Sequence, residues 1–107
     1  KVAMKDGALI RQRYPDRVPV LLHDVDNNTH DKKFLVPKDY KMAQFYSIVR
    51  SRLKLASRHA VFFSLCSGPT KDCILPNPND VMSNVYNRHK DSDNILCVFM
   101  KKESVFG

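Results

Sequence analysis

Apolar residues recur along the chain at two different spacings, a pattern that predicts both strands and helices. Short apolar runs bounded by turn formers predict strands over 18–23, 34–36, 60–65 and 95–100. Apolar residues at three- and four-residue intervals predict a long helix that begins near Asp39 or Lys41 and ends at Leu53, and a shorter helix over 81–89. Asp39 is the expected N-cap of the long helix.

The segment 32–53 joins a strand, a turn and the long helix, and the rest of the fold is expected to form around it. Pro37 ends the strand and cannot donate a ladder hydrogen bond, which favours a position at the edge of a sheet. Side chains alternate along a strand, so Lys33 and Leu35 point to one face and their neighbours to the other. An extended peptide that adds to such an edge gains main-chain hydrogen bonds, and pockets beside the edge read its side chains.

The order strand, strand, helix, strand, helix, strand predicts one mixed sheet. Turn formers over 24–31 join the first two strands in a hairpin, and the run 95–100 is apolar on both faces, which is typical of a central strand. The simplest arrangement is an α+β, ubiquitin-like β-grasp fold with a four-stranded mixed sheet, in which the first and last strands are parallel and central.

Three segments are expected along the chain. Residues 1–13 form a short N-terminal extension with at most two helical turns around 8–14, residues 14–100 form the ubiquitin-like domain, and residues 101–107 form a flexible C-terminal tail. Because the chain begins with Lys1, either the protein starts at Met4 or residues precede Lys1.

Length and charge narrow the classes of function. A chain of 107 residues fits one domain with a core of its own, and its net charge of +7 favours acidic partners such as nucleic acid, anionic lipid or acidic peptides. No apolar run approaches the roughly 18 residues of a membrane span, and the N-terminus lacks the apolar segment of a signal peptide. A cytoplasmic monomer is expected.

The cysteines and histidines predict neither catalysis nor metal binding. Three cysteines, an odd number without a C-x-x-C pair, favour reduced thiols over disulfides or zinc. No nucleophile and base pair is recognisable, and Cys97 lies in an apolar strand, where a buried thiol is inert. The chain is therefore expected to be no enzyme and to need no metal or cofactor.

Several motifs resemble one family over the chain from about Asp6 to Gly107. The chain is similar to the GABARAP-type ubiquitin-like modifiers of autophagy, which are related to the microtubule-associated protein light chains, in the runs 10–20 (IRQRYPDRVPV), 32–37 (KKFLVP), 44–46 (QFY) with 48–53 (IVRSRL), and 103–107 (ESVFG).

The resemblance implies a modifier that is conjugated through its C-terminal glycine. An E1-like activating enzyme and an E2-like conjugating enzyme would transfer Gly107 to phosphatidylethanolamine on the autophagosomal membrane, and a cysteine protease would recognise Phe106 and Gly107 during processing. Cargo receptors and adaptors would then bind through aromatic-x-x-aliphatic motifs. Glycine suits a narrow catalytic channel because it has no Cβ.

The resemblance also assigns two pockets and a set of basic contacts. The pocket for the motif's aromatic residue would be lined by Asp6, Ile10, Pro19, Leu21, Lys33, Leu35 and Ile95. The pocket for its aliphatic residue would be lined by Phe34, Val36, Pro37, Tyr40, Phe45 and Ile48. Acidic residues beside the motif would meet Arg17, Lys32, Lys33 and Arg52. From pattern alone, the apolar residues also fit a simple core, and the cations a solvated surface.

The chain departs from the family pattern at several places. The loop 24–31 is shorter, Asp31 stands where a basic residue is common, and Lys41 replaces a capping threonine, which removes a capping box with Gln44. Ile95 replaces a frequent phenylalanine, which would widen the aromatic pocket. The loop 67–80 is longer, and only about thirteen residues precede Tyr14, where the family has two helices.

Two other functions fit the same sequence. A ubiquitin-like modifier could be attached to a protein rather than to lipid. The positive charge, with Arg50, Arg52 and Lys54 at one helix end, also suits a module that binds nucleic acid or the cytoskeleton, although no stacking motif of aromatic and basic residues accompanies it.

Overall fold

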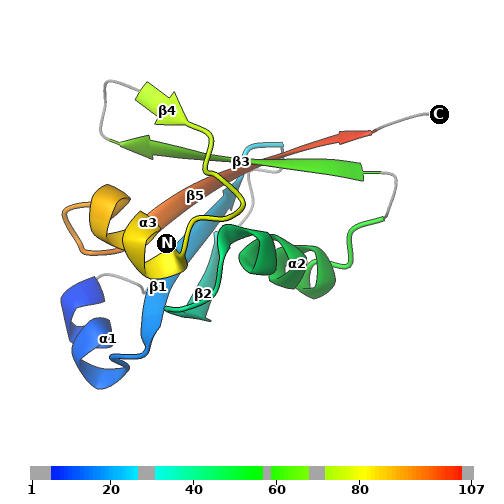
Figure 1. Ribbon diagram of the computed structural model, residues 1–107. Helices are drawn as coiled ribbons and strands as arrows, with labels where there is room; N and C mark the ends of the chain where they lie inside the picture. The colour runs from blue at the N-terminus through cyan, green and yellow to red at the C-terminus, as the bar shows by residue number, and fades with distance from the viewer. Residues whose placement is uncertain (1–5, 27–30, 57–58, 68–71, 105–107) are drawn as a thin grey trace.

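The computed structural model describes residues 6–26, 31–56, 59–67 and 72–104. These residues form, in chain order, α1 (Gly7–Arg13), β1 (Arg17–Asp24), β2 (Lys32–Pro37), α2 (Met42–Arg52), β3 (His59–Ser67), β4 (Asp72–Ile74), α3 (Met82–His89) and β5 (Leu96–Ser104). Figure 1 shows α2 and α3 packed against one sheet and α1 beside the start of β1.

The sheet has the order β2-β1-β5-β3-β4. The first and last strands are parallel neighbours at its centre, whereas β1–β2, β3–β5 and β3–β4 are antiparallel. The predicted ubiquitin-like β-grasp arrangement is therefore confirmed, as is the position of β2 at an edge. Its edge position suits Pro37, because a proline in a central strand would leave a ladder hydrogen bond unmade.

The sheet differs from the expected one at two places. It has a fifth strand, β4, where the sequence predicts only a loop; its three residues pair with Leu65–Ser67 and are too few to give a recognisable alternation. The last strand also continues from Met100 to Ser104. Lys101 and Glu103 are exposed and polar, so the apolar pattern stops at Met100 although backbone pairing with β3 goes on.

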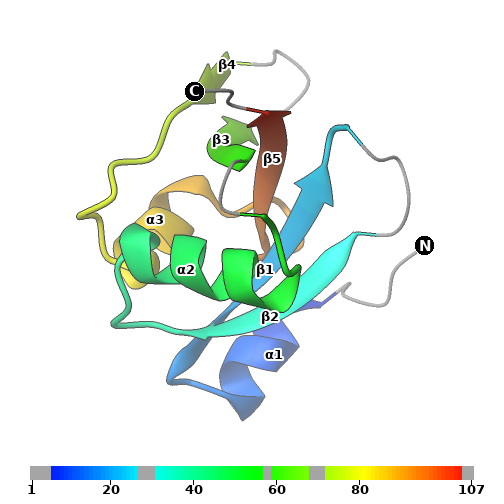
Figure 2. The same cartoon turned by 90° about the vertical axis from the view of Figure 1, so that its right-hand side faces the viewer.

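The core lies between one face of the sheet and the two longer helices (Figure 2). Met42, Phe45 and Val49 form the buried stripe of α2 and are at most 2% exposed. The centre of the Phe45 ring lies 5.5 Å from that of Phe34 on β2 and 5.4 Å from that of Phe63 on β3, so this side chain packs α2 against both strands. Burial of such a side chain contributes about 1.5 to 3 kcal/mol.

The N-termini of α2 and α3 cap each other through the backbone. Met42 donates its N–H to the carbonyl of Asp80 at 2.8 Å, and Met82 donates to the carbonyl of Tyr40 at 2.7 Å. The predicted N-cap, Asp39, is wrong, because the cap position falls on Lys41. A lysine side chain cannot accept the hydrogen bonds of the first turn, and the facing loops supply carbonyls instead.

The expected loss of the capping box is only half right. The Lys41 N–H still donates to Oε1 of Gln44 at 2.9 Å, so the half of the box that depends on glutamine is retained. What is missing is the side-chain acceptor that a threonine would supply at position 41.

The N-terminal helix occupies the residues expected to hold two helical turns. Asp6 caps α1 by accepting a hydrogen bond from the Leu9 N–H at 3.1 Å. At the other end, the guanidinium of Arg11 donates to the carbonyls of Pro15 and Arg17, each at 2.7 Å. Arg11 thereby fixes the turn that leads from α1 into β1 and, with it, the backbone of Arg17.

Candidate functional site

The outer edge of β2 presents backbone groups that point away from β1 and take no part in its ladder of hydrogen bonds. The Lys38 N–H donates to the Asp16 carbonyl at 2.9 Å, so the residues of β2 whose number is even bond to β1. Because backbone groups alternate along a strand, the N–H and C=O of Lys33 and Leu35 point away from β1. Pro19, which has no N–H, lies opposite Leu35 and fits this register. With β2 at the end of the sheet order, these groups face the open side.

Side chains on β2 alternate as the sequence predicts. Phe34 and Val36 are buried in the core at 3% and 2% exposure, whereas Lys33 and Leu35 are exposed on the opposite face, Leu35 at 37%. A peptide added to this edge would therefore meet a buried apolar layer on one side and accessible side chains on the other.

The structure brings together most residues predicted for the aromatic pocket. In the register of β1 and β2, Pro19 lies opposite Leu35 and Leu21 opposite Lys33. Ile95 immediately precedes Leu96, which pairs with Val20 and belongs to the core cluster under α2. Ile95 is only 2% exposed but does not belong to that cluster. Since neighbouring side chains point to opposite faces, Ile95 lies on the same outer face as Pro19 and Leu35.

The two remaining members of that set lie on or beside α1. Ile10 is half-buried, and Asp6 is exposed with its carboxylate engaged in capping the helix. They stand near β1, since α1 packs against that strand. Their contact with a peptide stays a prediction.

The set predicted for the aliphatic pocket divides into core and surface. Phe34, Val36 and Phe45 are core residues, as the simpler interpretation of the pattern held. Pro37, Tyr40 and Ile48 are half-buried, and Tyr40 and Ile48 pack against the core from outside. Only these three can offer accessible surface to a ligand without movement of the core.

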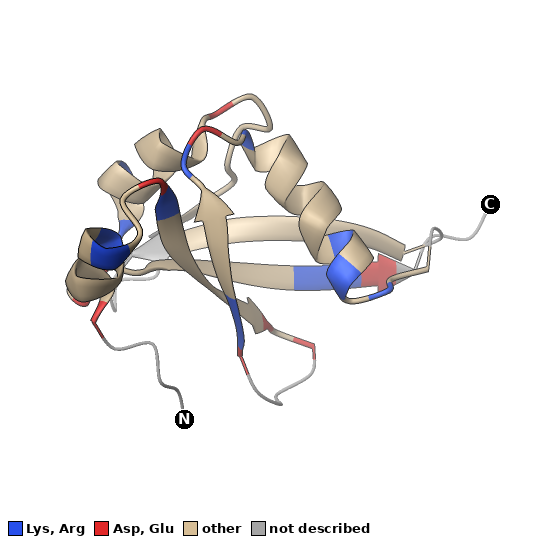
Figure 3. Ribbon diagram, turned by 90° about the horizontal axis from the view of Figure 1, so that it is seen from below, with Lys and Arg blue, Asp and Glu red and all other residues tan. Residues whose placement is uncertain are grey.

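Basic side chains flank the β2 edge. Figure 3 shows Lys and Arg at the start of β2 and in the last turn of α2. Lys32, Lys33, Arg17 and Arg52 are all exposed. The guanidinium carbon of Arg52 lies 4.6 Å from the centre of the Phe34 ring, which places this cation beside the strand, and Nη1 of Arg17 donates to the Leu35 carbonyl at 3.1 Å. The sequence did not predict this last hydrogen bond.

Phe106 and Gly107, the predicted processing and conjugation residues, lie outside the described residues. The described part of β5 ends at Ser104. Their role stays a prediction from the family resemblance.

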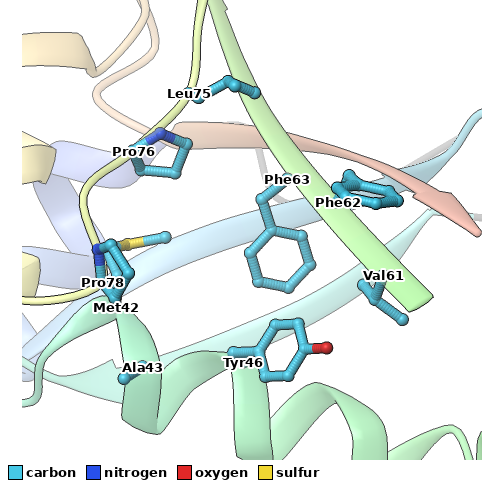
Figure 4. A pocket seen from close by; sticks show the side chains of 9 residues that line it. All are labelled: Met42, Ala43, Tyr46, Val61, Phe62, Phe63, Leu75, Pro76 and Pro78. Atoms are coloured by element: carbon cyan, nitrogen blue, oxygen red, sulfur yellow. The ribbon is translucent and has the colours of Figure 1, made fainter.

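A second surface feature, which the sequence did not indicate, lies across the sheet from β2. An apolar cavity of about 370 Å³ opens between α2, β3 and the loop after β4 (Figure 4). Met42 and Tyr46 face Phe63 across it, and Pro76 and Pro78 close one side. No pattern in the sequence connects the prolines of the 67–80 loop with α2. Among the described residues, Tyr46 is the one ionisable side chain that lines the cavity.

The thiol of Cys97 is held in its neutral form. Burial, and then the nearby charge and hydrogen bond of Asp91, raise the pKa of Cys97 to about 12. Its Sγ donates to Oδ2 of Asp91 at 3.4 Å. A thiol with this pKa is a poor nucleophile at neutral pH. Within the described residues, no three side chains of His, Cys, Asp or Glu are placed to hold a metal ion.

The prediction of reduced thiols is wrong for Cys73, which is disulfide-bonded. In the backbone register of β3 and β4, Cys73 lies opposite Cys66. The β3–β4 hairpin was not predicted, so the sequence gave no indication that Cys73 forms a disulfide. Cys97 is a free cysteine.

In the described part of the chain, no helix is long and apolar enough to cross a bilayer.

Comparisons with known proteins agree over nearly the whole chain. The family described as "Autophagy protein Atg8 ubiquitin like" matches residues 3–107. Autophagy-related protein 8 of Mycosarcoma maydis is 41% identical over 102 residues, which are 92% of this chain and 81% of that protein. Autophagy-related protein 8e of Arabidopsis thaliana is 36% identical over 106 residues, 95% of this chain and 82% of that protein.

The fold has close counterparts among solved structures. The crystal structure of Trypanosoma brucei ATG8 superposes with a TM-score of 0.73 at 30% identity and covers 97% of this chain and 88% of that one. Plasmodium falciparum Atg8, solved in complex with a Plasmodium falciparum Atg3 peptide, superposes with a TM-score of 0.69 at 23% identity, covering 91% of this chain and 83% of that one.

Proposed function

Since the chain belongs to the Atg8 family of ubiquitin-like autophagy proteins, we propose that it is a modifier conjugated through Gly107 to phosphatidylethanolamine on autophagosomal membranes. In this role it recruits receptors that carry aromatic-x-x-aliphatic motifs and catalyses nothing itself. The observation that carries the receptor-binding role is the open edge of β2, where the backbone groups of Lys33 and Leu35 point away from the sheet.

Strand addition explains how this edge would bind a motif. The peptide would pair with the outward N–H and C=O groups of β2, which gives affinity without dependence on sequence. Selectivity would come from the two sides of the strand: the outer face, where Leu35 is exposed and Pro19 and Ile95 are buried, for the aromatic residue, and the half-buried Tyr40 and Ile48 for the aliphatic one. Exposed cations beside the edge would favour acidic neighbours of the motif, each contributing about 0 to 1 kcal/mol.

The proposed partners follow from the family. They are an E1-like activating enzyme, an E2-like conjugating enzyme and a cysteine protease that processes the C-terminus. The Plasmodium falciparum relative was solved with an Atg3 peptide, which supports an E2-like partner for this chain. After conjugation the protein would move from the cytoplasm to the autophagosomal membrane.

Calorimetry with a motif peptide tests the receptor-binding role. Leu35→Ala should weaken binding by about 5- to 30-fold, because truncating an apolar contact of this size costs about 1 to 2 kcal/mol. Ile74→Ala is the matched control: Ile74 is also apolar, 47% exposed and on a short edge strand, but at the opposite end of the sheet. Equal affinity of the two variants would argue against docking at β2.

Conjugation is tested at Gly107. With activating and conjugating enzymes from the same source, Gly107→Ala should abolish the lipid adduct, and mass spectrometry of the unsubstituted protein should find phosphatidylethanolamine on Gly107. Normal lipidation of the alanine form would refute the assignment. A protein lysine as acceptor would instead identify a protein modifier.

The structure weakens the nucleic-acid alternative at the helix end that suggested it. The guanidinium of Arg50 donates to the carbonyls of His59 at 2.8 Å and Ala56 at 2.9 Å, so this cation already links α2 to β3. Tight binding of RNA at physiological salt would nevertheless favour that alternative over the modifier role.

A further inference from the structure

The hydrogen bond between Arg17 and Leu35 occupies the edge that the proposed function uses. Nη1 of Arg17 donates to the Leu35 carbonyl at 3.1 Å. This carbonyl points away from β1, since the ladder hydrogen bonds are made by the even-numbered residues of β2 and, just beyond the strand, by Lys38. It is therefore one of the acceptors that an added strand needs.

Arg17 is held where it can make this contact. Arg11 fixes its backbone by donating to the Arg17 carbonyl at 2.7 Å, while the Arg17 side chain is exposed. The described part of the chain gives Arg17 no carboxylate as an ion-pair partner. A guanidinium bonded to a neutral carbonyl is free to move to a better acceptor, because hydrogen bonds to a carboxylate are roughly twice as strong.

We propose that Arg17 competes with incoming peptides for the Leu35 carbonyl and thereby selects motifs that carry an acidic residue beside the segment that pairs with Leu35. When an acidic peptide binds, the guanidinium loses its hydrogen bond to the Leu35 carbonyl but forms a new one to the peptide's carboxylate. When a neutral peptide binds, the guanidinium loses the same hydrogen bond and forms no new one with the peptide. The side chain therefore acts against neutral motifs as well as in favour of acidic ones.

This role differs from that of an ordinary surface cation in one measurable respect. A cation that only attracts acidic residues leaves the affinity for a neutral peptide unchanged when it is removed. A competitor raises that affinity when it is removed. The inference rests on the proposed function, because it concerns peptides that dock on β2.

The experiment uses two synthetic peptides that share an aromatic-x-x-aliphatic core and differ only in carrying Glu or Gln at the two positions that flank this core. Arg17→Met retains an unbranched apolar side chain and removes the charge and the donors. Titration calorimetry should show the Gln peptide binding about two- to tenfold more tightly to Arg17→Met than to the unsubstituted protein, the range expected for one net hydrogen bond. The Glu peptide should bind more weakly.

Arg52→Met is the matched control. Arg52 is also an exposed arginine beside the same strand, but it lies over the Phe34 ring, and in the described part of the chain it makes no hydrogen bond to the edge of β2. Its removal should leave the affinity for the Gln peptide unchanged or lower it. Arg17→Met variants that bind the Gln peptide no better than the unsubstituted protein would overturn the inference while leaving the proposed function intact.

Two further outcomes are decisive. If neither peptide binds the unsubstituted protein, the receptor-binding role fails and the inference falls with it. Should Arg17→Met fold poorly, the NMR signal of the Arg17 guanidinium in the unsubstituted protein gives an independent readout. Binding of the Glu peptide should shift this signal relative to the free protein, because the guanidinium then bonds a carboxylate. Binding of the Gln peptide should shift it towards the value of a solvent-exposed guanidinium. A signal that neither peptide changes would contradict the competition.

Discussion

Gly7 packs directly against the backbone of Asn94, at the point where α1 meets the turn before β5. Its N–H donates to the Asp93 carbonyl at 2.8 Å, and a Cβ at this position would overlap the Asn94 carbonyl. The hydroxyl of Tyr86 on α3 donates to the same Asn94 oxygen at 2.6 Å. One turn thus holds α1 and α3 to the base of the sheet, close to Ile95 in the proposed aromatic pocket.

Substitution of Gly7 should displace α1. Gly7→Ala forces the helix away from a backbone atom that cannot rotate aside, and overpacking of this kind costs about 1 to 3 kcal/mol. Chemical denaturation should show that loss of unfolding free energy. Ala8→Ser, at the exposed neighbouring position, should change it by no more than about 0.5 kcal/mol. Equal stability of the two variants would mean that α1 does not dock as described.

Arg50 should stabilise the fold through the two hydrogen bonds that its planar guanidinium donates, and not only through its charge. Its guanidinium bridges the carbonyls of His59 and Ala56 and stacks 5.6 Å from the Tyr46 ring. Arg50→Lys should cost about 1 to 2 kcal/mol of unfolding free energy, because one ammonium cannot reproduce the planar fork. Arg52→Lys, at an exposed site without such carbonyl partners, is the control. Similar denaturation midpoints for both variants would argue against the bridge.

Cys97 should make stability depend on alkaline pH. The folded protein keeps the thiol proton up to a pKa of about 12, whereas the unfolded chain releases it near 8.5. Above pH 8.5 the unfolded state therefore binds fewer protons, and unfolding becomes easier as pH rises. Cys97→Ser does not titrate there, so its stability relative to the unsubstituted protein should improve between about pH 8.5 and 10. A constant difference over this range would contradict the raised pKa.

Sequence patterns predicted the sheet edge well for a physical reason. Pro37 favours the end of a strand or the edge of a sheet, and the alternation from Lys33 to Val36 assigns each side chain to a face; both are local properties. The continuously apolar β5 likewise indicated a central strand. Its polar continuation to Ser104 was missed because backbone pairing with β3 needs no apolar side chains.

The features that the sequence did not predict depend on contacts between distant segments. Met42 and Met82 find their N-terminal acceptors in each other's preceding loops, which no capping residue reveals. The hydrogen bond from Arg17 to Leu35 joins residues 18 positions apart and depends on the register of β1 and β2. The family resemblance predicted which residues surround the edge. It did not predict that the side chains of Phe34, Val36 and Phe45 are buried in the core and leave no surface accessible to a ligand.

Amide hydrogen exchange along β2 tests the docking edge most directly. In the free protein the amides of Lys33 and Leu35 should exchange quickly, because they face solvent, whereas those of Phe34 and Val36 are bonded to β1. A bound motif peptide should slow exchange at Lys33 and Leu35 by at least tenfold and leave Phe34 and Val36 nearly unchanged. Unaltered exchange at Leu35 in a saturated complex would contradict strand addition at β2.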